Sequence, residues 1–261
     1  MCFDVDSRPP IAPIAGGALE SGELTLTAAD GNRFTAFRAR AAEPTGAGIL
    51  ILPDVRGLHA YYEDLALRFA ENGVDAVAID YFGRTAGLGR REGDFEYMPH
   101  VEQTTWAGLQ ADVRAGAEYA RSDEAGAPGS LFTIGFCFGG RLSFLSGTLG
   151  LDLAGVIGFY GTLVGPGRAG MPAPVDEASN IESPVLGLFG AADQAITAEA
   201  RAAFDEALGA AGVEHRVVAY AGAPHSFFDR KADEFADASA AAWTETLGFI
   251  RSRTAQPTAA R

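Results

Sequence analysis

Six short runs of mostly apolar residues, spaced along the chain, constrain its fold more than any other feature. Such runs, without regular polar–apolar alternation, are typical of strands buried on both faces of a parallel sheet. The runs are Ala47–Leu52, Val74–Ile79, Leu131–Phe136, Gly155–Tyr160, Val185–Phe189 and His215–Tyr220. Helical stretches lie between or after them, namely Tyr62–Asn72, Val101–Arg121, Gly140–Leu149, Ala198–Ala211 and Asp233–Arg251. This alternation predicts an α/β protein with a mostly parallel central sheet and helices on both faces.

The chain ahead of these runs carries a different pattern. Leu24–Ala28 and Arg33–Arg40 alternate polar and apolar residues and flank the dipeptide Asp30-Gly31. Asp-Gly between two alternating segments is a strong signal for a tight turn joining antiparallel strands. The sequence therefore predicts an N-terminal antiparallel hairpin before the parallel sheet begins.

The domain organisation predicted from the sequence is simple. Residues 1–20 are expected to form an extended arm, because residues 7–18 are rich in proline and glycine. Residues 21–252 contain no repeat and no linker that would divide them, so they are expected to form one domain. Residues 253–261 read as a flexible tail.

Two segments inside the predicted domain lack clear periodicity, residues 83–100 and residues 161–182. Both are long for connections between secondary-structure elements, and long ordered loops often border active sites. We therefore expect these two segments to contribute to the surroundings of a site.

Charge and composition exclude several classes of function. The chain has 34 acidic and 20 basic residues, a net charge of −14, whereas nucleic-acid binding requires clustered positive charge. No apolar run reaches the roughly 18 residues of a membrane span. Met1–Asp6 is acidic where a signal peptide would be basic, so we expect a cytoplasmic protein. The two cysteines, Cys2 and Cys137, predict neither a disulfide nor a zinc site, and nothing in the sequence indicates an oligomeric state.

The segment Gly135-Phe136-Cys137-Phe138-Gly139 ends one strand-like run and precedes a helical stretch. G-x-C-x-G in this position is the pattern of a nucleophile elbow in which cysteine replaces serine. Both glycines are needed, because side chains there would clash with the neighbouring strand and helix. At a helix start the dipole favours a Cys137 thiolate, and the N–H of Phe138 can stabilise an oxyanion. The alternative is an unreactive buried cysteine in a glycine-rich turn.

The acid and the histidine that accompany such a nucleophile follow it along the chain in that order. Asp193 comes directly after the run Val185–Phe189, and His225 lies in the loop after the last run. Both are therefore expected at the carboxyl edge of the sheet, beside Cys137. Taken singly, Asp193 is better explained as a turn residue with a capping role, and His225 is equally well explained as an ordinary loop histidine. The ordered placement of all three favours a Cys-His-Asp triad.

With these motifs the chain resembles the dienelactone hydrolase, or carboxymethylenebutenolidase-like, family of α/β-hydrolases from about Leu24 to Ile250. The matching motifs are the elbow Gly135–Gly140, the G-x-x-D segment that ends at Asp193, and His225-Ser226-Phe227. The resemblance implies an α/β-hydrolase fold and a second oxyanion donor, the backbone N–H of Val55. It also implies that Asp54 takes the place of a family glutamate that pairs with the resting thiol.

The resemblance further implies arginines that hold the carboxylate of a lactone substrate. One of the two family positions is occupied here by Asp229, with Arg230 next to it, and the other falls in residues 83–100. The candidates for binding a substrate carboxylate are Arg56, Arg84, Arg90, Arg91 and Arg230. For Arg56 and Arg84, a solvated or ion-paired arginine without a role in binding is the alternative.

The chemistry that these residues predict is nucleophilic acyl transfer, for which no cofactor or metal is needed. Cys137 attacks an ester or lactone carbonyl, His225 acts as general base and then as general acid, and Asp193 orients the imidazole. The expected partner is a small ester or lactone, anionic substrates included. One alternative is a carboxylesterase or thioesterase with the same triad. The other is a non-catalytic ligand-binding or redox-sensing α/β protein.

Overall fold

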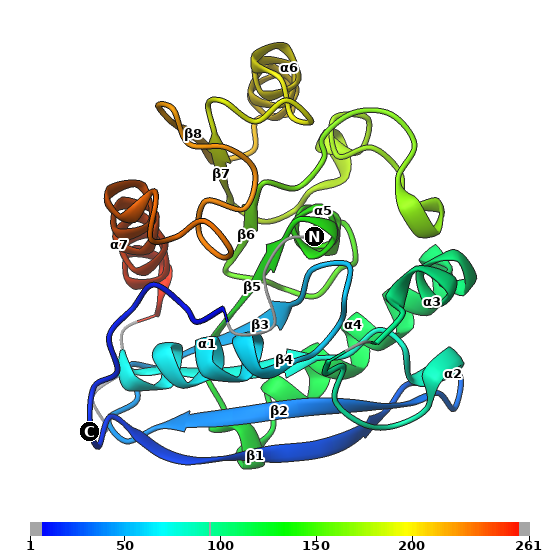
Figure 1. The fold of residues 1–261 in the computed structure, drawn as a ribbon, viewed down its shortest axis with the longest axis vertical. Helices are drawn as coiled ribbons and strands as arrows, with labels where there is room; N and C mark the ends of the chain where they lie inside the picture. The colour runs from blue at the N-terminus through cyan, green and yellow to red at the C-terminus, as the bar shows by residue number, and fades with distance from the viewer. Residues whose placement is uncertain (1–6, 94, 256–261) are drawn as a thin grey trace.

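The computed structural model describes residues 7–93 and 95–255, which build an eight-stranded mixed sheet (Figure 1). The strands are β1 (Ala18–Thr27), β2 (Arg33–Ala41), β3 (Ala47–Leu52), β4 (Val74–Ile79), β5 (Ser130–Phe136), β6 (Gly155–Phe159), β7 (Val185–Gly190) and β8 (His215–Tyr220). Their order across the sheet is β1-β2-β4-β3-β5-β6-β7-β8. β2 pairs antiparallel with β1 and β4, and every later pairing is parallel. The predicted hairpin and parallel sheet are confirmed.

Burial of the strands follows their residue pattern. Strands β3 to β7 are buried along their whole length, as the absence of alternation predicts. Strand β8 is partly exposed, so the prediction that this run is buried on both faces is wrong. The physical reason is its place at the edge of the sheet, where the polar residues His215 and Arg216 meet solvent on one side.

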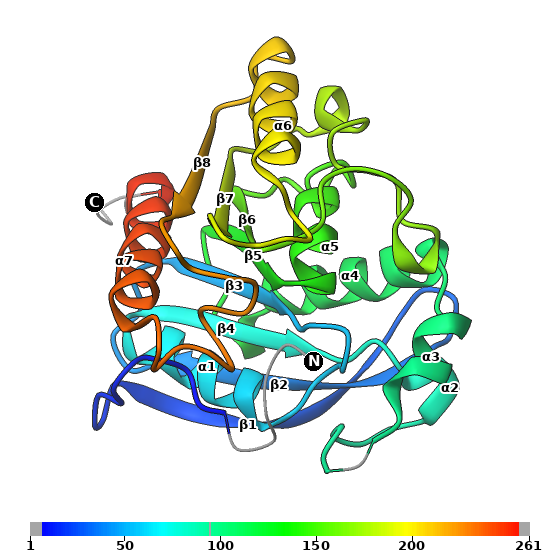
Figure 2. The same cartoon turned by 45° about the horizontal axis from the view of Figure 1, so that its top comes forward.

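Helices cover both faces of the sheet (Figure 2). They are α1 (Ala60–Glu71), α2 (Gly83–Ala86), α3 (Tyr97–Gln103), α4 (Trp106–Ala120), α5 (Phe138–Ser146), α6 (Ala198–Ala210) and α7 (Ala236–Arg253). Helices α1 and α7 contact each other through the rings of Phe69 and Trp243, whose centroids are 4.8 Å apart. Within β6, Gly155 faces α7 and Gly158 faces α5. Because these two glycines point to opposite sides of the strand, α5 and α7 pack on opposite faces.

One predicted helix is two helices in the structure. The stretch Val101–Arg121 reads as continuous, but α3 ends at Gln103 and α4 begins at Trp106. The break lies at Thr105, whose side-chain oxygen accepts a hydrogen bond from the N–H of Gly108. A threonine in this position caps a new helix, and this local signal overrides the apolar periodicity that continues across it.

The ends of the described chain differ slightly from the predicted boundaries. Strand β1 begins at Ala18, inside the predicted arm, because its first residues pair with the end of β2. Helix α7 continues to Arg253, the first residue of the predicted tail. Residues 1–6 of the arm and 256–261 of the tail lie outside the described residues. Of the helices in the described part, none has both the length and the apolar character that crossing a membrane requires.

Candidate active site

Four residues singled out in the sequence lie at the carboxyl ends of parallel strands. Val55 follows β3, Cys137 follows β5, Asp193 follows β7 and His225 follows β8. The carboxyl ends of parallel strands meet along one edge of a sheet, which is where α/β proteins build their sites. The topology therefore brings together residues that are up to 170 positions apart in sequence.

The turn between β5 and α5 holds Cys137 in a strained conformation. Its φ is 54° and its ψ −109°, a region that residues with a side chain rarely adopt. A side chain at Gly135 would overlap the carbonyl of Gly139, and one at Gly139 would overlap the carbonyl of Leu52. Glycine is thus required at both positions, as the elbow pattern predicts. The N–H of Cys137 donates to the Phe159 carbonyl at 3.0 Å, which anchors the turn to β6.

Cys137 and His225 line the same cavity, whose volume is about 520 Å³. Its lining also contains Val55 and Phe138, the two expected sources of oxyanion N–H groups. Phe138 is the first residue of α5, so its N–H has no acceptor inside the helix. The remaining lining residues are Tyr97, Met98, Arg141, Thr162, Pro166, Gly167, Arg168, Met171, Ser226 and Arg230.

Asp193 and His225 are joined by a short hydrogen bond. His225 Nδ1 lies 2.7 Å from Asp193 Oδ2, while Oδ1 of the same carboxylate accepts from the N–H groups of Ala195 (2.8 Å) and Ile196 (3.3 Å). Burial raises the pKa of Asp193, but the hydrogen bond and charge of His225 and the two N–H groups outweigh this effect and lower it overall. An ionised Asp193 therefore faces the imidazole and fixes its orientation.

A buried carboxyl, Asp229, is connected to His225 through Tyr160. The hydroxyl of Tyr160 donates to Asp229 Oδ2 at 2.6 Å, and the Tyr160 ring centroid lies 4.9 Å from that of His225. Burial raises the pKa of Asp229 well above its usual value, although its hydrogen bonds from Tyr160 and from the N–H of Arg230 oppose the rise. The position at which the family resemblance implies an arginine thus holds a buried acid.

Asp54 is fully buried at the end of β3 and is not among the residues that line the cavity. Its Oδ1 accepts a hydrogen bond from the N–H of Arg56 at 2.8 Å, and its carbonyl oxygen accepts from Gly57 at 3.1 Å. Its own N–H donates to the hydroxyl of Tyr62 at 2.9 Å. In this geometry the carboxylate shapes the turn that presents Val55 to the cavity.

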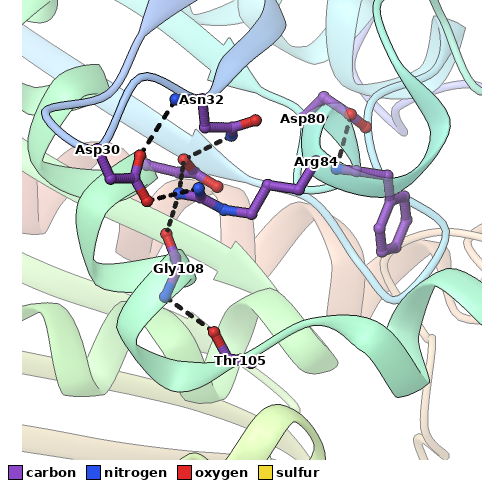
Figure 3. A network of polar contacts seen from close by, with 8 residues as sticks. Asp30, Asn32, Asp80, Arg84, Thr105 and Gly108 are labelled. Atoms are coloured by element: carbon purple, nitrogen blue, oxygen red, sulfur yellow. Dashed lines mark hydrogen bonds and ion pairs between the residues drawn. The ribbon is translucent and has the colours of Figure 1, made fainter.

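Arg84 lies in a polar network beside the β1–β2 turn (Figure 3). Its guanidinium forms ion pairs with Asp30 (2.5 Å) and Asp112 (2.8 Å) and donates to the Gly108 carbonyl at 3.2 Å. It does not line the cavity. Arg84 is therefore an ion-paired arginine outside the cavity lining, and it connects the hairpin turn to α4.

None of three further candidate arginines lines the cavity, although Arg56 lies near a residue that does. Arg90 pairs with Glu63 and with Glu92 (3.1 Å). Arg91 is buried and pairs with Asp80 at 2.9 Å. Arg56 is nearly buried, with its guanidinium carbon 6.0 Å from the centre of the Tyr97 ring. Of the five candidates, Arg230 is the one that lines the cavity.

Sequence reasoning missed two cavity arginines, Arg141 and Arg168. Arg168 lies in residues 161–182, so the length of that loop was a signal for its position. Arg141, in α5, had no such signal. Together with Arg230 they give the cavity three arginines, and no carboxylate among the described residues lines it. Within residues 7–93 and 95–255, no group of three or more His, Cys, Asp or Glu side chains could hold a metal ion.

A mixed sheet covered on both faces by helices, with a tight glycine-flanked turn from β5 into α5, has the architecture of an α/β-hydrolase. The family model of the dienelactone hydrolase family matches residues 34–253. The chain therefore belongs to the dienelactone hydrolase family, and it is a hydrolase that acts on esters or lactones.

Individual relatives agree with this assignment. "Putative carboxymethylenebutenolidase" of Methylorubrum extorquens is 31% identical over 236 residues, which are 85% of this chain and 77% of that protein. The protein of the same name from Salmonella typhimurium is 30% identical over 230 residues, 84% of this chain and 83% of the relative. The crystal structure of "Putative Dienelactone Hydrolase" from Klebsiella pneumoniae superimposes with a TM-score of 0.75 at 28% identity, covering 89% of this chain and 99% of that one.

Proposed function

We propose that Cys137, His225 and Asp193 form a catalytic triad that hydrolyses a small ester or lactone. One observation carries the proposal: Cys137, on its strained turn, lines the same cavity as a histidine that Asp193 holds at 2.7 Å. An unreactive structural cysteine would not need a cavity or an oriented imidazole beside it. The nucleophile and its base are thus available to the same bound carbonyl group.

The reaction proceeds in two stages. His225 takes the proton of the Cys137 thiol, and the thiolate attacks the carbonyl carbon of the substrate. The N–H groups of Phe138 and Val55 stabilise the resulting oxyanion, which is worth roughly 3–4 kcal/mol per donor. Protonated His225, stabilised by ionised Asp193, gives its proton to the leaving oxygen, and a thioester forms. Water, activated by neutral His225, then hydrolyses the thioester and releases the thiol.

A thiolate nucleophile favours substrates with a stabilised leaving group. Thiolate leaves a tetrahedral intermediate more readily than alkoxide does, so attack on an alkyl ester tends to revert. An enol lactone or an aryl ester expels a stabilised anion instead. The relatives' printed name, "Putative carboxymethylenebutenolidase", is that of an enzyme whose substrate is an unsaturated lactone with a carboxylate. A cavity that three arginines line, with no carboxylate among its described lining residues, suits such an anion.

The test is turnover of enol lactones, aryl esters and alkyl esters by the protein and four variants. Cys137→Ala and His225→Ala are expected to lose about 10³-fold or more of kcat on every substrate. Cys137→Ser replaces the thiol by a hydroxyl nucleophile and is expected to retain a small fraction of the wild-type kcat. The matched control is His215→Ala, which removes a histidine of the edge strand and should leave turnover unchanged.

Three outcomes would count against different parts of the proposal. Wild-type turnover by both Cys137→Ala and His225→Ala would show that the site is wrongly assigned. Equal rates on alkyl and enol esters, with the variants inactive, would leave the triad in place and remove the leaving-group argument. Activity confined to thioesters or simple carboxylic esters would favour a thioesterase or carboxylesterase.

A further inference from the structure

Arg141 is an unusual residue in helix α5, one turn after the candidate nucleophile. Only 2% of it is exposed, and it is the largest of the almost fully buried side chains in the described part of the chain. Its backbone N–H donates to the carbonyl oxygen of Cys137 at 3.2 Å. Any movement of Arg141 relative to the sheet would therefore also move the elbow.

The guanidinium of Arg141 donates four hydrogen bonds to a single segment, residues 162–172, which we term the wall segment. The acceptors are Thr162 Oγ1 (3.1 Å) and the carbonyl oxygens of Gly165 (2.7 Å), Met171 (3.0 Å) and Pro172 (3.0 Å). The wall segment has no strand pairing of its own and only one short 3-10 turn. This set of bonds from one side chain therefore supplies much of what holds its shape.

Two further contacts show how closely the wall segment is fitted. A Cβ at Gly167 would lie 2.7 Å from Arg141 Nε and 2.8 Å from Cζ, so the guanidinium lies directly against this backbone. On its other side, Arg168 Nη1 lies 3.8 Å from Met98 Sδ in α3. Arg141, Gly167, Arg168 and Met98 all line the cavity of Cys137. The wall segment thus forms one side of the site. It is hydrogen-bonded to α5 through Arg141 and contacts α3 through Arg168.

The charge of Arg141 is not neutralised by an ion pair with any residue in 7–93 or 95–255, since its acceptors are carbonyl and hydroxyl oxygens. Burial lowers the pKa of Arg141 from its ordinary value, and the more distant Asp176 opposes this effect. A buried cation without a paired anion is costly, and an apolar side chain would fill the same space at lower cost. No anion of the described residues pairs with this charge, so it can attract an anion that enters the cavity that Arg141 lines.

We propose that Arg141 is a positioning residue that holds the wall segment against the nucleophile helix and sets the preference of the Cys137 site for anionic substrates. The inference rests on the proposed function, because it concerns the cavity in which Cys137 would react. Arg141 acts on substrate binding and leaves the chemical steps to Cys137 and His225. Its removal is therefore expected to change KM much more than kcat.

The experiment compares two aryl esters, anionic mono-4-nitrophenyl glutarate and its neutral methyl ester, which differ in charge and by one methyl group. Arg141→Met, which keeps length and loses the charge and the four bonds, is expected to raise KM about tenfold or more for the anion. For the neutral ester the expected rise is about threefold or less, and kcat should change by less than about threefold for both. Arg141→Lys restores the charge without the fork of donors and should recover part of the anion's KM.

Several results would overturn the inference. They are an unchanged KM for the anion in Arg141→Met, an equal rise in KM for both esters, or a loss confined to kcat. Should Arg141→Met fail to fold, Thr162→Val removes one acceptor and leaves the guanidinium in place. It is expected to raise the anion's KM about twofold to threefold, and an unchanged KM in this variant would also overturn the inference.

Cys137→Ala separates the two proposals. If this variant is inactive while Arg141→Met binds both esters like the wild type, the assignment of Arg141 falls and the proposed triad stands. If Cys137→Ala retains turnover, the proposed function fails, and the role of Arg141 in that site fails with it. Thermal unfolding of each variant shows whether a changed KM is accompanied by a loss of the fold.

Discussion

The hydroxyl of Tyr160 donates a 2.6 Å hydrogen bond to Oδ2 of Asp229, so a buried acid is connected to the ring that packs against His225. Burial raises the pKa of Asp229 well above its usual value. A carboxyl whose pKa is higher in the folded state stabilises the fold while it is protonated. That contribution is lost as the pH rises through the folded-state pKa.

Asp229→Asn is expected to keep the size of the side chain and an oxygen that accepts the hydrogen bond from Tyr160. It removes the group that titrates. The free energy of unfolding of the wild type should fall, relative to this variant, as the pH rises above about 4. Asp229→Ala should cost about 1–3 kcal/mol, because it leaves the Tyr160 hydroxyl without its acceptor. Urea unfolding at a series of pH values measures both effects. The same pH dependence in wild type and Asp229→Asn would contradict the raised pKa.

Asp193→Asn tests the orientation of His225. The amide cannot stabilise a protonated imidazole, so kcat is expected to fall about 10³- to 10⁴-fold. The pKa of Asp193 is lowered in the folded protein, so its contribution to stability is present above an unfolded pKa of about 4 and is lost at lower pH. The variant should be less stable than wild type at neutral pH, and the difference should shrink as the pH falls below the unfolded pKa of about 4. A fall in kcat of less than tenfold would argue against the triad.

Gly139→Ala tests the steric requirement of the elbow. A Cβ at Gly139 would overlap the carbonyl oxygens of Leu52 and Pro53, so we expect a loss of more than about 3 kcal/mol or failure to fold. The matched control is Gly22→Ala in β1, where a Cβ meets nothing within 4 Å. It should change stability by less than about 1 kcal/mol. Equal stability of the two variants in chemical denaturation would show that the close approach is not required.

The network around Arg84 provides a pH-dependent prediction of stability. Burial raises the pKa of Asp112 to about 6, although hydrogen bonds from Asn32 and Arg84 oppose the rise. Protonated Asp112 contributes fully to the stability of the fold below the unfolded pKa of about 4. This contribution falls as the pH rises and is lost once the pH passes the folded pKa of about 6. Relative to Asp112→Asn, the wild type should lose up to about 3 kcal/mol between these pH values.

The control for this experiment is Asp30→Asn, in the same network. Asp30 is exposed and its pKa is lowered, first by its hydrogen bond from Arg84, so its contribution has the opposite sign and is present above about pH 4. Chemical denaturation at about pH 4 and pH 7 compares the two. A wild type and an Asp112→Asn variant with parallel pH profiles would contradict the prediction.

Much of the fold could be predicted because its signals are local. Each buried strand is a short apolar run, and the hairpin turn is marked by Asp30-Gly31. The elbow could be located because two glycines must flank Cys137 for steric reasons. The edge position of β8 and the helix break at Thr105 were missed, since the first depends on strand order and the second on one capping hydroxyl.

The arginines could not be assigned from sequence, because their partners are remote. Arg84 meets Asp112, and Arg91 meets Asp80, only after the chain has folded. Whether such a side chain binds substrate or closes an ion pair depends on these tertiary contacts. Arg141 was missed for the same reason, since nothing near it in the sequence shows that its guanidinium reaches residues 162–172.

The close approach of Gly139 to β3 has a consequence for how such a protein can diversify. It locks the elbow against the turn that carries Val55, and each of these turns directly follows a fully buried strand. The opposite side of the cavity comes from a loop, which Arg141 holds to α5, and from a short helix, and neither adds a strand to the sheet. Mutations in this loop can therefore change which substrates the cavity admits, while the turns that carry Cys137 and Val55 keep their geometry. A library confined to residues 162–172 would exploit this separation.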